Sequence, residues 1–150
     1  MKNLFVISLI FLLLGCYSLH VREYQPIDTA DKTIMLPPGG SALLGAIKDV
    51  IAKNGWKIFI YSGPAVTKKS ETEDVTSGTF KSKYRLALSW RHIDHCIGID
   101  RGPLYLYDIS VIDNDFGDEV MTMSGRGCEA DIAETFETWL RGGSIKSKEQ

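Results

Sequence analysis

The stretch Tyr84-Arg85-Leu86-Ala87-Leu88-Ser89-Trp90-Arg91 alternates bulky apolar side chains with small or polar ones. Successive side chains of an extended strand point to opposite faces of a sheet. The alternation therefore predicts a strand that has one face buried and the other in water, as in an antiparallel sheet that is covered on one side only.

The residues that follow predict that this strand belongs to an antiparallel meander. Leu104 to Asp113 has bulky residues on both faces, which favours a central strand. Asn114-Asp115-Phe116-Gly117-Asp118 has the composition of a turn, and Val120 to Ser124 reads as the returning strand. The second half of the chain is thus expected to be mainly sheet.

One amphipathic helix is expected before this meander along the chain, and a second is expected after it. The first begins near Ser41, a good N-cap residue, and stops at Asn54-Gly55. The second carries Glu129 and Asp131 in its first turn and ends at Gly142-Gly143. Apolar residues recur at helical spacing in both, namely Leu43, Leu44, Ile47, Val50 and Ile51 in the first and Ile132, Ala133, Phe136, Trp139 and Leu140 in the second.

Together these elements predict an α+β fold with the order (β)αββββα. Thr33 to Leu36 is the uncertain first strand, Trp56 to Tyr61 follows the first helix, and Thr67 to Gly78 is expected to be a loop. We expect a mostly antiparallel sheet of four to five strands, with the two amphipathic helices packed on one face.

The beginning of the chain reads as a secretory leader. Lys2 precedes a mostly aliphatic run from Leu4 to Leu14, which is too short to span a bilayer as a helix. Leu13-Leu14-Gly15-Cys16 resembles the lipobox of bacterial lipoproteins. The resemblance implies that a diacylglycerol is attached to the Cys16 thiol and that the leader is cleaved off before it.

This resemblance divides the chain into four parts. Residues 1–15 are the signal peptide, and residues 16–32 comprise the lipidated cysteine and a solvated tether. Residues 33–143 form one α+β domain, and residues 144–150 are a disordered tail. An ordinary signal peptide that happens to end near a cysteine is the alternative interpretation.

Composition and charge restrict the classes of function. The chain is 44% hydrophobic and 24% charged, which is ordinary for a globular protein. Its formal net charge of -2 offers no basic surplus for nucleic-acid phosphates, so we expect no nucleic-acid partner. No second apolar stretch reaches membrane-spanning length, so the lipid would be the only attachment to the membrane.

Cys96 and Cys128 remain as a pair once Cys16 is assigned to the lipid. An even number of cysteines in a secreted chain favours a disulfide between them. Such a bridge closes a loop of about 33 residues and is worth roughly 3–4 kcal/mol on the loop-entropy estimate. Two separate buried thiols are the alternative.

Candidate chemical sites are sparse. His92 and His95, close to Asp94 and Cys96, are the candidates for a metal site, but surface histidines beside a disulfide explain them more simply. The acidic run from Asp113 to Glu119 fails the EF-hand pattern and suits a turn. We therefore expect no metal or other cofactor.

Other features of the sequence also do not indicate catalysis. Ser124-Gly125-Arg126-Gly127 suits a sharp passage from strand to helix better than an anion cradle. Trp90, Tyr105 and Tyr107 suit packing within the sheet better than ligand binding. No nucleophile elbow is present, so an enzyme is not expected.

The sequence thus predicts a lipid-anchored, non-catalytic interaction domain with an envelope protein as its partner. The layout of Ser41 to Tyr61, Tyr84 to Trp90, Ile109 to Asp113 and Gly117 is similar to that of small periplasmic lipoproteins of unassigned function. Tyr17 occupies the position after the lipidated cysteine, where aspartate often signals inner-membrane retention in the lipoproteins that the leader resembles. This favours the periplasmic side of the outer membrane.

Two other functions fit the same features of the chain. The first is an immunity or inhibitor lipoprotein directed against a periplasmic toxin or hydrolase. The second is a lipoprotein that binds a small ligand between its helices and its sheet.

Overall fold

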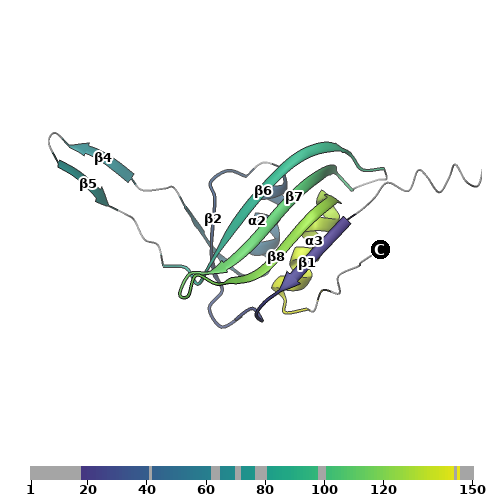
Figure 1. Cartoon of the computed structure of the whole chain (residues 1–150), viewed down its shortest axis with the longest axis horizontal. Helices are drawn as coiled ribbons and strands as arrows, with labels where there is room; N and C mark the ends of the chain where they lie inside the picture. Colours follow the sequence, from purple (N-terminus) through teal and green to yellow (C-terminus); the bar gives the residue numbers. More distant parts are fainter. Residues whose placement is uncertain are drawn as a thin grey trace, which may run out of the picture.

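Six strands form one mixed sheet, and two helices pack on one of its faces (Figure 1). The computed structural model describes residues 18–40, 42–61, 65–69, 72–76, 81–97, 101–143 and 145. The elements of this body are β1 (Ser18–Glu23), β2 (Thr33–Leu36), α2 (Ala42–Lys53), β3 (Lys57–Ile60), β6 (Tyr84–His95), β7 (Pro103–Asp113), β8 (Glu119–Cys128) and α3 (Glu129–Leu140).

The predicted α+β class is confirmed, with a sheet larger than expected. The strand order is β1-β8-β7-β6-β2-β3, and every neighbouring pair from β1 to β6 is antiparallel. β2 runs parallel to both β3 and β6. Helix α2 joins β2 to β3, because two parallel strands need a crossover connection.

The predicted meander forms the centre of the sheet. Val111 in β7 lies opposite Leu86 in β6 and Met121 in β8, and all three side chains are buried. The alternation of buried and exposed residues along β7 shows that only one sheet face carries the core. The predicted division into a buried and a wet face is therefore confirmed in these strands.

Both helices occupy the expected segments and bury the expected apolar stripes. The buried side chains are Leu43, Leu44, Ile47 and Ile51 in α2 and Ile132, Phe136, Trp139 and Leu140 in α3. The glycine stop after α2 is also confirmed, because Gly55 has a φ of 76° and donates its N–H to the Ala52 carbonyl. Of the helices in the described part of the chain, none is long and apolar enough to cross a membrane.

The segment predicted to be a solvated tether contributes an edge strand instead. β1 pairs with β8 over its whole length, and Leu19 is buried in the core. Gly125 has a φ of 144°, and a Cβ at this position would lie 2.0 Å from the Ser18 carbonyl oxygen. The two backbones approach this closely because Gly125 lacks a side chain. The strand depends on its pairing with β8, which is distant in sequence, so the local sequence does not reveal it.

The expected loop from Thr67 to Gly78 contains a hairpin. β4 (Ala65–Lys69) and β5 (Thr72–Thr76) form a separate two-stranded antiparallel sheet, which extends away from the larger sheet in Figure 1. The backbone register pairs Ala65 with Thr76 and Lys69 with Thr72. The polar composition of this segment is typical of a loop. It does not indicate strands, because this hairpin contributes no strand to the main sheet.

We predict that Gly125→Ala lowers the free energy of unfolding by about 2–3 kcal/mol, because the added Cβ would collide with β1 and the φ would be strained. Urea denaturation measures the loss. Gly40→Ala is the matched control, because a Cβ there meets nothing within 4 Å, and it should change stability by less than about 0.5 kcal/mol. Equal losses in the two variants would contradict this account of β1.

Candidate functional site

The end of the sheet at which β6 and β8 finish and β7 begins carries most of the residues singled out from the sequence. We call it the disulfide end. Cys96 follows β6 and Cys128 ends β8, and the predicted disulfide joins them with a Cα–Cα distance of 6.0 Å. The Cys96 N–H also donates to the Gly102 carbonyl at 3.1 Å. The disulfide therefore links the two strands that flank the start of β7.

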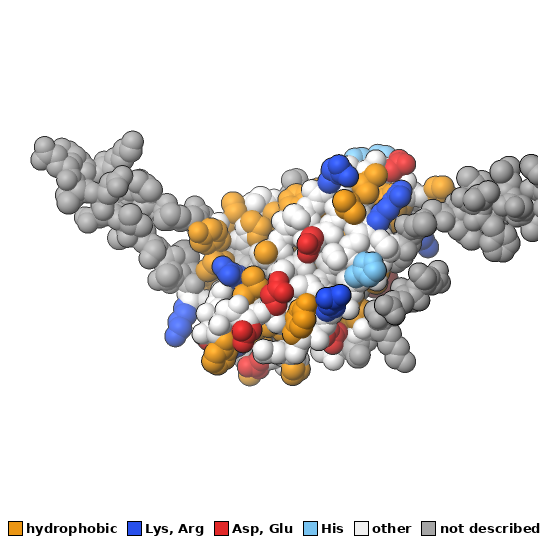
Figure 2. Space-filling view, viewed as in Figure 1, with side chains coloured by type: hydrophobic (Ala, Val, Ile, Leu, Met, Phe, Trp, Pro, Cys, Tyr) orange, Lys and Arg blue, Asp and Glu red, His pale blue; other side chains and the backbone are white. Residues whose placement is uncertain are grey.

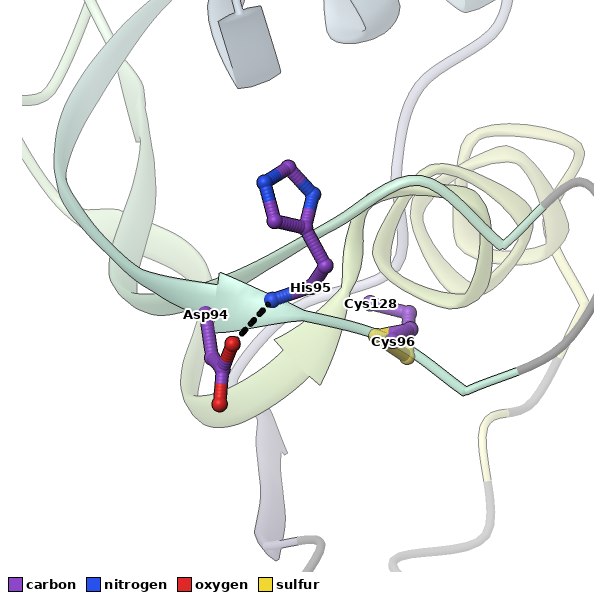
Figure 3. The surroundings of a disulfide bond; sticks show 4 residues. All are labelled: Asp94, His95, Cys96 and Cys128. Atoms are coloured by element: carbon purple, nitrogen blue, oxygen red, sulfur yellow. Dashed lines mark hydrogen bonds between the residues drawn. A yellow bond between two sulfur atoms is a disulfide. The ribbon is translucent and has the colours of Figure 1, made fainter.

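A break in the β6–β7 register orients the two histidines at this end. The register shifts between His92 and Asp94, which leaves Ile93 as an extra residue in β6. Residues three apart in a regular strand point to opposite faces, and an inserted residue restores a common face. The rings of His92 and His95 accordingly lie in edge contact, with centroids 5.1 Å apart. Figure 3 shows the His95 ring and the Asp94 side chain on opposite sides of the strand.

Within the part of the chain that is described, His92 and His95 do not belong to a cluster of metal ligands. No group of three or more His, Cys, Asp or Glu side chains there is arranged to hold a metal ion. Cys96 is part of the disulfide, so it offers no thiolate.

The Glu129 carboxylate accepts a hydrogen bond from the Tyr105 hydroxyl at 3.3 Å. Burial and the neighbouring Glu129 carboxylate raise the pKa of Tyr105, so the phenol keeps its proton.

The acidic run lies at the opposite end of the sheet and serves the turn between β7 and β8. The Lys83 ammonium lies 2.9 Å from a carboxylate oxygen of both Asp113 and Asp115. The Asp113 N–H donates to the Asp118 carbonyl, and the Gly117 N–H donates to the Asp113 carbonyl. The turn interpretation of this run is confirmed. We call it the acidic turn, residues 113–119.

The charges of this turn are coupled to the fold through Asp113. Burial alone would raise the pKa of Asp113, but hydrogen bonds from Lys83 and from the Asp115 N–H outweigh it and lower that pKa. The carboxylates of Asp115 and Asp113 raise the pKa of the Lys83 ammonium. The ion pair is therefore intact at neutral pH.

Two other sequence interpretations change. Ser124-Gly125-Arg126-Gly127 belongs to β8 rather than to a passage between strand and helix, because β8 continues to Cys128. Tyr105 and Tyr107 are buried in the sheet as predicted, whereas Trp90 is 37% exposed. Trp90 lies beyond Leu88, where the alternation of buried and exposed residues along β6 ends.

The sheet face opposite the helices is open in the part of the chain that the structure describes. Its central rows consist mainly of small side chains, and much of this face is neither hydrophobic nor charged in Figure 2. These residues are Ala87 and Ser89 in β6, Ser110 in β7, and Thr122 and Ser124 in β8. Such a surface offers area and hydrogen-bonding groups.

Sequence reasoning missed the apolar side chains exposed at the disulfide end. Ile93, Ile97 and Leu106 are exposed there, although a strand residue such as Leu106 reads as core in sequence. The feature that distinguishes Ile93 is the bulge. The bulge depends on the pairing of β6 with β7, so the local sequence does not reveal it.

Comparison with known proteins defines a fold rather than a family. Neither a protein-family model nor a curated protein matches the chain. A subunit of the PelC dodecamer from Paraburkholderia phytofirmans matches in structure with a TM-score of 0.53 and 11% sequence identity. The match covers 84% of this chain and 99% of that subunit. The chain therefore has a PelC-like fold.

A second structure of the same dodecamer, with one substitution, matches at a TM-score of 0.46 and 14% identity. That match covers 85% of this chain and 99% of the other chain.

We predict that the stability of the fold falls in acid through Asp113. Because its pKa is lowered in the folded state, its stabilising contribution is present above the unfolded pKa of about 3.9 and is lost as the pH falls through the folded value. Asp113→Asn should reduce stability at neutral pH and flatten the acid limb of urea denaturation. Asp115→Asn is the control, with a smaller effect because its side chain is 50% exposed. An unchanged acid limb in Asp113→Asn would contradict the assignment.

The double variant Cys96→Ser/Cys128→Ser should lose about 3–4 kcal/mol of unfolding free energy, because the unfolded chain gains the entropy of an open loop. Urea denaturation with and without reductant measures this loss. Reductant should destabilise the wild-type protein by a similar amount and leave the double variant unchanged. Equal stability of the oxidised wild type and the double variant would show that the disulfide does not stabilise the domain.

Proposed function

We propose that this chain is a lipid-anchored, non-catalytic interaction domain of the cell envelope that assembles first with copies of itself. The fold that it shares with a subunit of the PelC dodecamer is the observation that carries this proposal. The assembled copies would then act as an accessory component for another envelope protein.

The lipid anchor is supported by the leader. Leu13-Leu14-Gly15-Cys16 resembles a lipobox, and Cys16 lies outside the described residues. The folded body begins at Ser18, two residues further on. Residues 1–15 would be removed and Cys16 acylated, with Tyr17 favouring the periplasmic side of the outer membrane. The histidines His92 and His95 have no metal role in this proposal.

Self-association is supported by the surfaces that the described fold leaves uncovered. β1 and β3 are edge strands, and an edge strand presents unpaired backbone groups to another chain. At the end of β3, Ile60 and the following Tyr61 are exposed. The open sheet face of small side chains adds area that a second copy can approach closely.

Native mass spectrometry of the lipidated protein, released from its own membranes in mild detergent, tests the assembly. A defined homo-oligomer supports the proposal. A monomer at all concentrations contradicts it and favours the inhibitor or the small-ligand alternative. Ile60→Asp should weaken the oligomer if the β3 edge is used, and Phe116→Asp, an exposed site in the acidic turn, is the matched control.

Cys16→Ser should abolish lipid attachment and move the protein from the membrane fraction to the soluble fraction or leave an unprocessed precursor. The reason is that the serine hydroxyl does not replace the thiol that the lipid-transfer reaction modifies. Fractionation and intact mass measurement report the result, with Cys96→Ser/Cys128→Ser as the control that keeps Cys16. Normal membrane retention and processing of Cys16→Ser would end the lipoprotein proposal.

A further inference from the structure

We propose that the disulfide end of the domain rests on the phospholipid surface, with exposed apolar side chains entering the headgroup region and arginines beside them. This orientation rests on the proposed lipid anchor and goes beyond it, because a lipid on a flexible tether would leave the domain free to turn. The acidic turn then faces away from the membrane.

The sheet register places the start of the folded chain at this end. Ser18 in β1 lies opposite Arg126, Arg126 lies opposite Leu106, and Leu106 lies opposite Arg91. These four residues form one row across four strands. In Figure 1 the beginning of β1 lies at the same end as the connection between β6 and β7.

The short distance along the chain from Cys16 limits how far this row can lie from the lipid. A fully extended chain spans at most about 3.5 Å per residue, so two residues reach about 7 Å. Because β1 is part of the sheet rather than a tether, its first residue cannot move away from the body without breaking the pairing with β8. A lipid on Cys16 therefore brings the disulfide end to the membrane.

Exposed apolar side chains gather at the same end. The described residues include eight large hydrophobic side chains that are exposed, and four of them lie here: Trp90 at 37%, Ile93 at 42%, Ile97 at 99% and Leu106 at 45%. They lie on both sides of the bulge and just beyond the disulfide, so they surround the tip of the sheet rather than one face of it. Aliphatic and tryptophan side chains beside positive charges are typical of surfaces that enter the lipid interface.

Charges of both signs lie at the disulfide end, and the acidic ones include Asp131 in the first turn of α3. Arg91, Arg101 and Arg126 lie at the disulfide end, and Figure 2 shows Lys and Arg side chains beside hydrophobic ones where β6 and β7 meet. Asp94 and Glu129 are also at this end, and Glu129 is hydrogen-bonded to Tyr105. Arginine side chains pair with lipid phosphates, and anionic headgroups attract them.

The acidic turn occupies the opposite end of the sheet. The acidic turn carries Asp113, Asp115, Asp118 and Glu119 against Lys83. Because the disulfide joins the ends of β6 and β8, the apolar tip is held in one arrangement before it meets the lipid.

Tryptophan quenching by brominated lipid tests this orientation. The lipidated full chain is reconstituted into vesicles of phosphatidylethanolamine and phosphatidylglycerol, with and without bromine on the acyl chains near the headgroup. Two variants are compared in a Trp90→Phe background: Ile97→Trp at the disulfide end and Phe116→Trp in the acidic turn, both at exposed positions. Trp56 and Trp139 remain in both as a common buried background.

Bromine should lower the emission of the tryptophan at position 97 by at least about twofold and leave that at position 116 unchanged, because only the first would contact acyl chains. Quenching at neither position, or at position 116 alone, overturns the proposal. Equal quenching at both positions shows no fixed orientation and also overturns it. A blue-shifted emission at position 97 that bromine does not quench indicates an interface between copies and overturns it as well.

Intact mass measurement shows whether Cys16 carries the lipid, so it tests the proposed anchor separately from the orientation of the domain. If Cys16 carries no diacylglycerol, the anchoring proposal fails by itself. The unlipidated full chain is then added to the same vesicles, and the same quenching pattern decides the surface. Quenching at position 97 without the lipid supports a membrane-binding surface in its own right, and no quenching refutes it.

Discussion

The burial of β7 between β6 and β8 under the two helices is the constraint on which the rest of this structure depends. Ile109 and Val111 are fully buried. Val111 lies opposite buried Leu86 and Met121, and Ile109 lies opposite half-buried Leu88 and buried Met123. A slip of one residue in either pairing would turn every buried side chain of that strand toward water. The register of the central strands is therefore tightly specified, and the position of each strand end follows from it.

The two ends of the sheet acquire different chemistry because the central strands are antiparallel. The β6–β7 connection and the end of β8 share one end, where the disulfide, the arginines and the exposed apolar residues meet. The β7–β8 turn lies at the other end, where Lys83 holds Asp113 and Asp115. The orientation on a membrane that we propose follows from the first of these two ends, where the described chain begins at Ser18.

Several features could be predicted because they are local. The alternation in β6 and the helical stripes of α2 and α3 repeat with the period of their own element, so no knowledge of neighbours is needed. The Cys96–Cys128 pair could be predicted from cysteine number and secretion. The β1 strand and the Ile93 bulge could not, because each exists through pairing with a strand distant in sequence.

The sequence by itself determined the α+β class, the two helices, the central meander, the turn and the cysteine pair, since periodicity, turn residues and cysteine count act over short distances. Only the tertiary structure decided that part of the expected tether is strand β1, that His92 and His95 meet on one side of β6, and that two arginines and Leu106 share one row with Ser18. Register across strands carries this information, because residues more than a hundred positions apart become neighbours only when the sheet has formed.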